Sequence, residues 1–236
     1  MKNLSFFSIQ LLMVVIILVL SGCSQISSSE VDASAVYGEL SLTRSQSSTT
    51  ATAGVTFYVG GPTGTVINLD SPAVVTINGK TANSVTEPII NITSYQQSVA
   101  VSSGIATIIY QDKDGTSYSN SLPIPGDFSF TVPGTVSKSA GFNLAYTSDI
   151  GFFAGEQLEL TLQGNNNSIF ENFSLVTGAK NGTQNISASS LGGVTPGTLT
   201  VSICRASYPA AQAPYPKGTS VSNKSCSSST TVNLVN

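Results

Sequence analysis

The chain has 236 residues, with 9 Lys and Arg against 12 Asp and Glu, so its formal net charge is −3. This mildly acidic balance argues against nucleic acid as a partner, because phosphate binding requires a basic patch. The sequence contains no His, which excludes His-based catalytic triads, His general bases and most zinc sites. Charged residues make up only 9% of the chain, so disorder driven by high charge is not expected.

Residues 1–22 have the layout of a secretory signal, with Lys2 as a positive start and an uninterrupted apolar run over 11–20. The following segment 20–23, LSGC, resembles the lipobox of bacterial lipoproteins. The resemblance implies cleavage before Cys23 and acylation of that residue. Several acyl chains give stable membrane anchoring, whereas a single chain is marginal. The alternative, an uncleaved membrane helix, would need about 20 apolar residues.

Residues 23–35 are polar and Ser-rich, which predicts a flexible tether between the lipid and the first strand. In Gram-negative lipoproteins an aspartate after the acylated cysteine tends to retain the protein at the inner membrane. Ser24 occupies that position here. By this resemblance we expect a lipid-anchored protein of the cell envelope, at the outer membrane if the host has one.

From residue 36 the apolar residues recur with a period of two, which is typical of half-buried strands. Asn78-Gly79 follows one such run and predicts a tight hairpin, because both turn positions need positive φ. This pattern predicts strands over residues 36–43, 53–59, 66–69, 73–77, 89–93, 95–101, 105–111 and 116–122.

Two turn segments invite a ligand-binding interpretation that their sequences do not support. The glycine-rich turn 60–64 lacks the Gly-Lys-Ser/Thr ending and the helix of a phosphate-binding loop. The segment 112–115, DKDG, resembles part of a calcium loop, but the twelfth position from Asp112 is Pro123 instead of a bidentate Glu. A hairpin turn with Asp and Gly at their usual positions is the favoured interpretation of this segment.

Pro123 and Pro125 mark the predicted boundary between a first β-domain, 36–125, and a second, 126–236, because proline cannot donate to a strand ladder. In the second domain, Glu156 and Glu159 have an odd spacing, which places them on opposite strand faces and not as a paired acid and base. Alternation predicts further strands over 128–132, 140–146, 158–162, 169–176, 199–203 and 230–234.

The segment 186–205 resembles the late strands of immunoglobulin-like and fibronectin type III domains. In those families a leucine leads through a Pro-Gly turn into an alternating strand. Here the corresponding residues are Leu191, Pro196, Gly197, Leu199, Val201 and Ile203. The resemblance implies a β-sandwich and says nothing about a ligand. Together with the proline boundary and the alternating strands, we expect two immunoglobulin-like β-sandwich domains in tandem.

Two cysteines remain if Cys23 carries lipid, and an even pair in an oxidising compartment predicts a disulfide. Cys204 and Cys226 are each reached from a predicted strand. If the strands 199–203 and 230–234 pair antiparallel, the two cysteines can face each other. Closing a loop of this size contributes roughly 3 kcal/mol in the chain-entropy model.

The connection 205–225 is long for a hairpin, and loops beyond about 12–15 residues tend to be functional or disordered. Arg205, Tyr208, Tyr215 and Lys217 are the candidate binding residues in this loop, because Tyr and Arg are common contact residues. The alternative is a loop without a binding role, whose ends are simply joined by the disulfide.

These observations predict an all-β envelope protein that acts as a binding, adhesion or structural module, with an unknown envelope protein or glycan as partner. The alternative is a carbohydrate-binding accessory lipoprotein. Enzymatic activity is less expected, because no catalytic constellation can be nominated. We expect no cofactor, no metal site and no nucleic-acid partner, and we expect the membrane to be reached through the lipid on Cys23.

Overall fold

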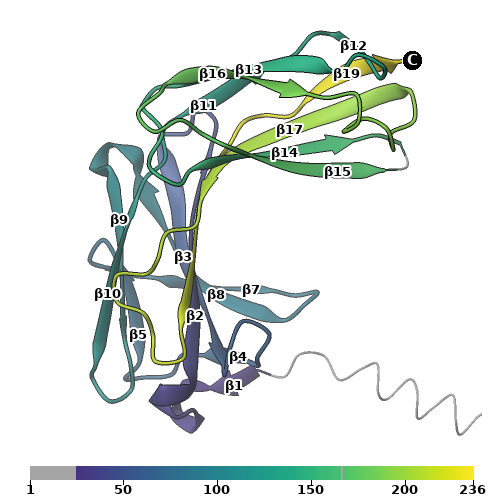
Figure 1. Cartoon of the computed structure of the whole chain (residues 1–236). Coiled ribbons are helices and arrows are strands. Elements are labelled where there is room, and N and C mark those ends of the chain that lie inside the picture. Colours follow the sequence, from purple (N-terminus) through teal and green to yellow (C-terminus); the bar gives the residue numbers. More distant parts are fainter. Residues whose placement is uncertain (1–24, 166) are drawn as a thin grey trace, which may run out of the picture.

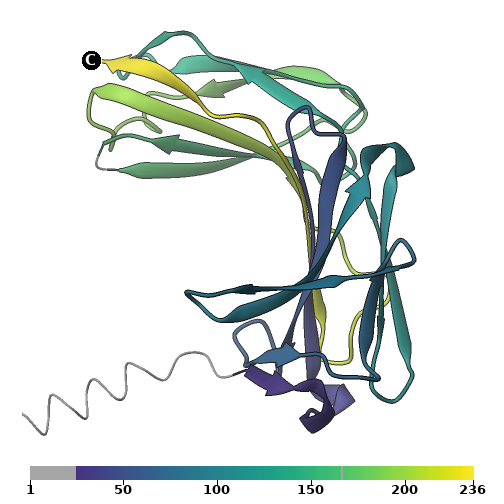
Figure 2. The same cartoon turned by 180° about the vertical axis from the view of Figure 1, so that it is seen from behind.

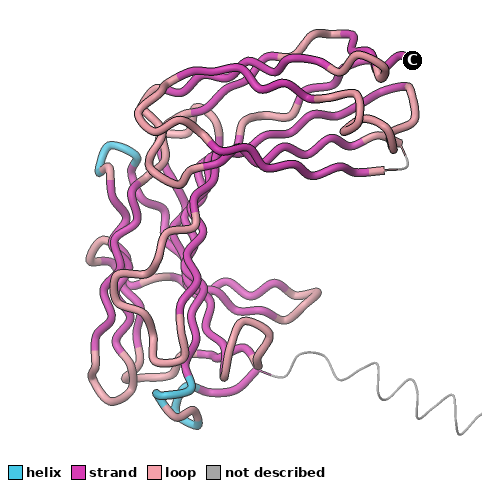
Figure 3. Tube along the Cα trace, in the orientation of Figure 1, coloured by secondary structure: helices cyan, strands magenta, loops and turns pink. Residues whose placement is uncertain are grey.

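The computed structural model describes residues 25–165 and 167–236. The predicted signal peptide, the lipidation site Cys23 and Ser24 therefore lie outside the described residues. Strands account for 57% of the described residues and helices for 4%, which confirms the predicted all-β fold. Figure 3 shows strands throughout and helix only in short peripheral turns. Within the described ranges, no helix has the length and apolar character needed to cross a membrane.

The strands form two elongated lobes that meet at a corner, as seen in Figure 1 and from behind in Figure 2. A 12-stranded sheet runs through both lobes, and a smaller sheet of four or three strands completes each one. The short helices are η1 (Ser28–Glu30), η2 (Ala33–Ala35) and η3 (Val101–Ser103).

In the first lobe the large sheet faces a four-stranded sheet. The large sheet contributes β1 (Gln25–Ser27), β2 (Val36–Ser45), β3 (Thr50–Val59), β4 (Val66–Asn68), β7 (Asn83–Glu87), β8 (Ile92–Ala100) and β18 (Thr219–Cys226). The four-stranded sheet consists of β5 (Val74–Ile77), β6 (Lys80–Thr81), β9 (Ile105–Gln111) and β10 (Ser117–Pro123). Leu40, Leu42 and Phe57 from the large sheet pack in one core with Ile108 and Tyr110 from the small one. This packing is consistent with a β-sandwich.

The second lobe repeats this arrangement around a separate core. The large sheet contributes β12 (Thr135–Ser137), β14 (Gln157–Gln163), β15 (Ser168–Ser174), β17 (Gly197–Ser207) and β19 (Thr230–Val235). The three-stranded sheet consists of β11 (Phe128–Thr131), β13 (Phe142–Ser148) and β16 (Asn181–Ile186). The predicted alternation holds in β13, where Phe142, Leu144 and Tyr146 are buried in this core.

The path of the chain between the lobes differs from the predicted division at residue 125. The first half of β17 pairs antiparallel with β19, as predicted, with Val201 opposite Thr230. Its second half pairs with β18, which then runs parallel to β2 in the first lobe. Residues 211–226, predicted as part of the second domain, therefore run along the first, because β18 completes the otherwise open edge of β2.

The predicted tether 23–35 is packed against the first lobe over its described residues. β1 pairs parallel with β4, and Val31 is only 5% exposed within the first core. Ser27 and Asp32 cap the two short helices that follow β1. The prediction of a flexible segment was therefore wrong from Gln25 onward, because a short strand and the apolar side chains of Ile26, Val31 and Ala35 attach it to the lobe.

The hairpin turns combine confirmed and corrected predictions. Asn78 and Gly79 have φ of 48° and 76°, as the predicted tight turn requires. Asp112 accepts hydrogen bonds from the N–H groups of Asp114 and Thr116, so it stabilises the turn itself. The predicted strand 89–93 was wrong at its start, because residues 88–91 form the turn that joins β7 to β8.

Candidate functional site

A pocket of about 240 Å³ opens where the two lobes meet. Its walls are the end of β10, the loop 153–155 before β14, and the segment 207–212, which begins with the last residue of β17. None of the side chains lining it is charged. Phe153 and Tyr208 contribute aromatic rings, and Asn120, Ser121 and Gln212 lie among the lining residues as amides and a hydroxyl.

Asn120 fixes the segment 207–212 and its continuation to β10. The side chain is 1% exposed, and its amide group donates to the Ala213 carbonyl while its carbonyl oxygen accepts from the Ala213 N–H, both at 3.0 Å. The side-chain oxygen of Gln212 accepts from the Ser121 N–H at 3.0 Å. These bonds fix the position of one wall of the pocket.

Tyr215 anchors the other end of the same loop inside the first lobe. Its side chain is 2% exposed, and its ring centroid lies 5.5 Å from Phe57 and 5.4 Å from both Tyr110 and Tyr118. A β-carbon at Gly38 would approach this ring to 2.0 Å, so only glycine leaves room for it. The prediction that Tyr215 contacts a partner is corrected, because its ring is a core residue.

Arg205, the second predicted contact residue, is also buried, at 0% exposure. Its guanidinium forms a buried ion pair with Glu156, with Nη2 and Oε2 2.5 Å apart, and donates to the Ser148 hydroxyl at 2.7 Å. Glu156 in turn accepts from the Phe153 N–H at 2.7 Å. The pair therefore positions the loop 153–155 that forms the second pocket wall, and Arg205 does not reach solvent.

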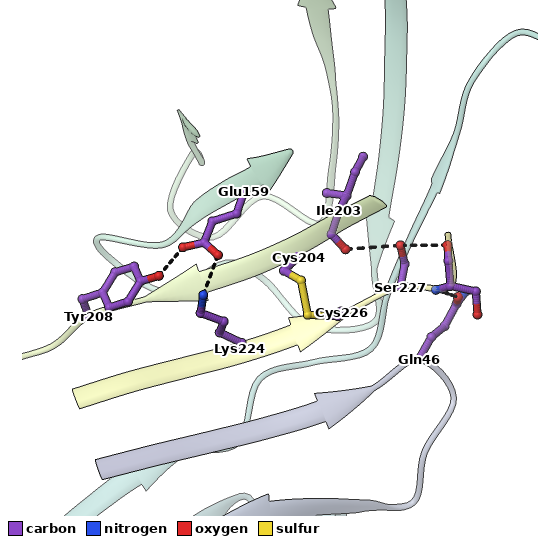
Figure 4. Close-up of a disulfide and its surroundings, with 9 residues drawn as sticks. Gln46, Glu159, Ile203, Cys204, Tyr208, Lys224, Cys226 and Ser227 are labelled. Atoms are coloured by element: carbon purple, nitrogen blue, oxygen red, sulfur yellow. Dashed lines mark hydrogen bonds and ion pairs between the residues drawn. A yellow bond between two sulfur atoms is a disulfide. The ribbon is translucent and has the colours of Figure 1, made fainter. Parts of the chain in front are cut away.

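Tyr208 is the predicted residue that the structure places at the pocket rim, where it is 53% exposed. Its hydroxyl donates to the Glu159 carboxylate, which also accepts from Lys224 Nζ at 2.7 Å (Figure 4). Burial opposes the charged form of Glu159, but the hydrogen bonds from Lys224 and Tyr208 outweigh it and hold its pKa below the usual value. The network fixes the orientation of the Tyr208 ring.

The Cys204–Cys226 disulfide lies beside this network and confirms the predicted pairing. Figure 4 shows it linking β17 and β18 next to Glu159 and Lys224. The two cysteines face each other in the β17–β18 register and not in the pairing of β17 with β19. Lys217 is exposed, and its backbone N–H donates to the Val36 carbonyl at 3.0 Å, so the loop is also held to β2.

A second set of contacts fixes the corner between the lobes. Arg44 in β2 donates to the Pro125 carbonyl at 3.0 Å and lies 3.9 Å from the Asp149 carboxylate. The Ser47 N–H donates to the Asp127 carboxylate at 2.8 Å. Because these bonds join segments on both sides of residue 125, the two pocket walls are held at a set separation.

No protein-family model matches this chain, and no curated protein sequence matches it either. Among residues 25–165 and 167–236, no three His, Cys, Asp or Glu side chains lie together in a way that would hold a metal ion. Asn120 and Phe153 were not among the residues predicted from the sequence. Their types carry no distinctive signal, and only the meeting of the two lobes places them beside Tyr208.

Proposed function

We propose that this protein is a lipid-anchored module of the cell envelope that binds a neutral, polar ligand in the pocket between its lobes. The observation that carries the binding role is the composition of the pocket: aromatic rings with amide and hydroxyl groups, and no charged lining side chain. Such a surface suits a ligand with many hydroxyl or amide groups, because a charged ligand would lose its hydration without gaining an ionic partner.

The envelope location rests on the lipobox-like segment 20–23 and on the disulfide, which suits an oxidising compartment. We expect Cys23→Ala to release the protein from membranes or block its processing. Palmitate labelling and membrane fractionation measure this, and normal labelling of the variant would contradict the anchor.

A carbohydrate is the second candidate ligand, favoured by the half-exposed Tyr208 ring beside the hydrogen-bonding groups of the pocket. Aromatic faces stack on the apolar faces of sugar rings. The exposed Gln212 amide is the lining amide available to bind their hydroxyl groups, since that of Asn120 is buried and bonded to Ala213. Under this hypothesis the protein is a carbohydrate-binding accessory lipoprotein. Otherwise it binds a polar segment of an envelope protein, as an adhesion or structural module.

A glycan array probed with the mature protein separates the two candidates. For a glycan that binds, Tyr208→Ala should weaken affinity by at least about fivefold, as expected of a contact residue. Phe170→Ala is the matched control, because Phe170 is 75% exposed but lies on β15, away from the pocket. Equal affinity of the Tyr208 variant and the control would contradict the pocket as the binding site.

We also propose that the core of the second lobe is immunoglobulin-like. Leu199, Val201 and Ile203 of β17 are buried, and Pro196 directly precedes that strand. This supports the resemblance at the level of the strand pattern. The departure of β17 into the first lobe is a difference from a self-contained domain, so we propose the resemblance for the lobe core alone.

A further inference from the structure

The turn of the β7–β8 hairpin displays two neighbouring isoleucines to solvent. Ile89 is 93% exposed and Ile90 is 53% exposed, and Val85 on β7 adds a third side chain at 43%. Figures 1 and 2 show this hairpin projecting from the first lobe, with its turn as the outermost part. Among the large exposed apolar residues of the described ranges, Ile89 and Ile90 alone are adjacent in sequence.

An exposed apolar turn is unusual, because turns favour Gly, Pro, Asn, Asp and Ser for their backbone and hydrogen-bonding properties. The strand before the turn does not pack against the lobe, since every residue of β7 is exposed. Packing of β7 therefore does not explain the two isoleucines. Apolar groups concentrated at an exposed tip mark a surface for a partner or a membrane.

The lipid anchor would begin beside this tip. The Gln25 side-chain amide donates to the Asn91 carbonyl at 2.7 Å and to the Thr93 hydroxyl at 3.1 Å. Gln25 is therefore attached to the turn itself. Cys23 lies two positions earlier in the sequence, and two extended residues span at most about 7 Å. A bilayer holding acyl chains on Cys23 would then be within reach of the hairpin tip.

The charge pattern around the hairpin tip fits contact with a lipid bilayer. Glu87 is the only ionisable residue in the segment 83–93, and it lies at the end of β7, before the turn. No Lys or Arg in the segment would direct it toward anionic headgroups. Contact with the bilayer would therefore depend on apolar burial and would be insensitive to lipid charge.

We propose that Ile89 and Ile90 insert into the headgroup and acyl boundary of the membrane that carries the lipid on Cys23. This inference rests on the proposed lipid anchor and adds a second attachment point to it. Two adjacent points fix the orientation of the first lobe on the membrane, whereas a lipid on a flexible segment would leave the lobe free to rotate.

The test uses the full acylated protein in vesicles of uncharged phosphatidylcholine. Ile89→Cys introduces a thiol that carries an environment-sensitive fluorophore, because Cys204 and Cys226 are joined to each other. Phe170→Cys with the same fluorophore is the matched control, since Phe170 is exposed but lies in the other lobe. We expect a blue-shifted emission and quenching by lipid-attached quenchers at position 89, and neither at position 170.

Addition of Ile90→Asn to the Ile89→Cys protein should lower the ratio of inserted to withdrawn tip by about tenfold, since one half-buried isoleucine side chain is lost from the membrane. Vesicle flotation of each labelled protein reports on the anchor separately. Protein that floats while the probe at 89 stays in water overturns the membrane-contact inference and leaves the anchor intact. Protein that fails to float overturns the anchor and this inference with it.

Discussion

Substitution of Tyr215 distinguishes a core role from a recognition role for the loop that follows β17. Tyr215→Ala removes a ring that is 2% exposed and contacts Phe57, Tyr110 and Tyr118. Truncation of a buried aromatic side chain costs about 3–5 kcal/mol, because the transfer free energy is lost and a cavity remains. We expect the free energy of unfolding to fall by this amount.

The hydroxyl of Tyr215 provides a second and opposite expectation. It is buried and has no hydrogen-bond partner among the described residues, and burial raises the pKa of the phenol. Leaving a buried polar group unpaired costs about 1–3 kcal/mol, so Tyr215→Phe should be neutral or stabilising by up to about 1 kcal/mol. A loss of stability in Tyr215→Phe would mean that the hydroxyl is hydrogen-bonded in solution.

The contact with Gly38 completes the experiment as a double-mutant cycle. Gly38→Ala places a β-carbon 2.0 Å from the ring and should destabilise the protein, because the ring must move. When Tyr215 is already alanine, the same substitution should cost much less, and the difference measures the coupling. Urea unfolding of the disulfide-intact protein provides each value. Tyr208→Ala is the control, expected within about 1 kcal/mol of wild type. Additive effects of Gly38→Ala and Tyr215→Ala would refute the packing argument.

Three further predictions concern the polar and covalent links around the pocket. Arg205→Met should lower the free energy of unfolding by about 3–5 kcal/mol, because it leaves the Glu156 carboxylate buried without its partner. Addition of Glu156→Gln to the same chain should recover part of this loss. Urea unfolding of the single and double variants measures both effects. Glu159→Gln should be less stable than wild type at pH 7, and the difference should shrink as the pH falls below the usual titration range of glutamate. The reason is that a carboxylate whose pKa is lowered by folding stabilises the protein above its unfolded pKa and loses that contribution as the pH falls through the folded value. Urea unfolding at several pH values measures this, and a pH-independent difference would contradict the network. The double variant Cys204→Ser, Cys226→Ser should lower the free energy of unfolding by about 3 kcal/mol, since the disulfide joins residues 22 positions apart. An unchanged midpoint in thermal or urea unfolding would contradict this.

Local pattern was enough to predict the all-β fold, the Asn78-Gly79 turn and the cysteine pairing. A period of two specifies which face of a strand is buried, and positive φ at Asn78 and Gly79 follows from the residue types. The Cys204–Cys226 link needed only an even count and two flanking strands.

The sequence by itself did not determine which edge a strand would join or which side of the surface a residue would occupy. β18 joins β2, where it pairs with Gly38 to Ser45, about 180 positions earlier in the chain. Arg and Tyr are common contact residues, yet both Arg205 and Tyr215 are buried. Arg205 is buried because it pairs with the Glu156 carboxylate, and Tyr215 is buried because Gly38 leaves room for its ring. Only the tertiary structure could decide this, because burial depends on partners that are distant in sequence, whereas alternation and turn chemistry are read from neighbours.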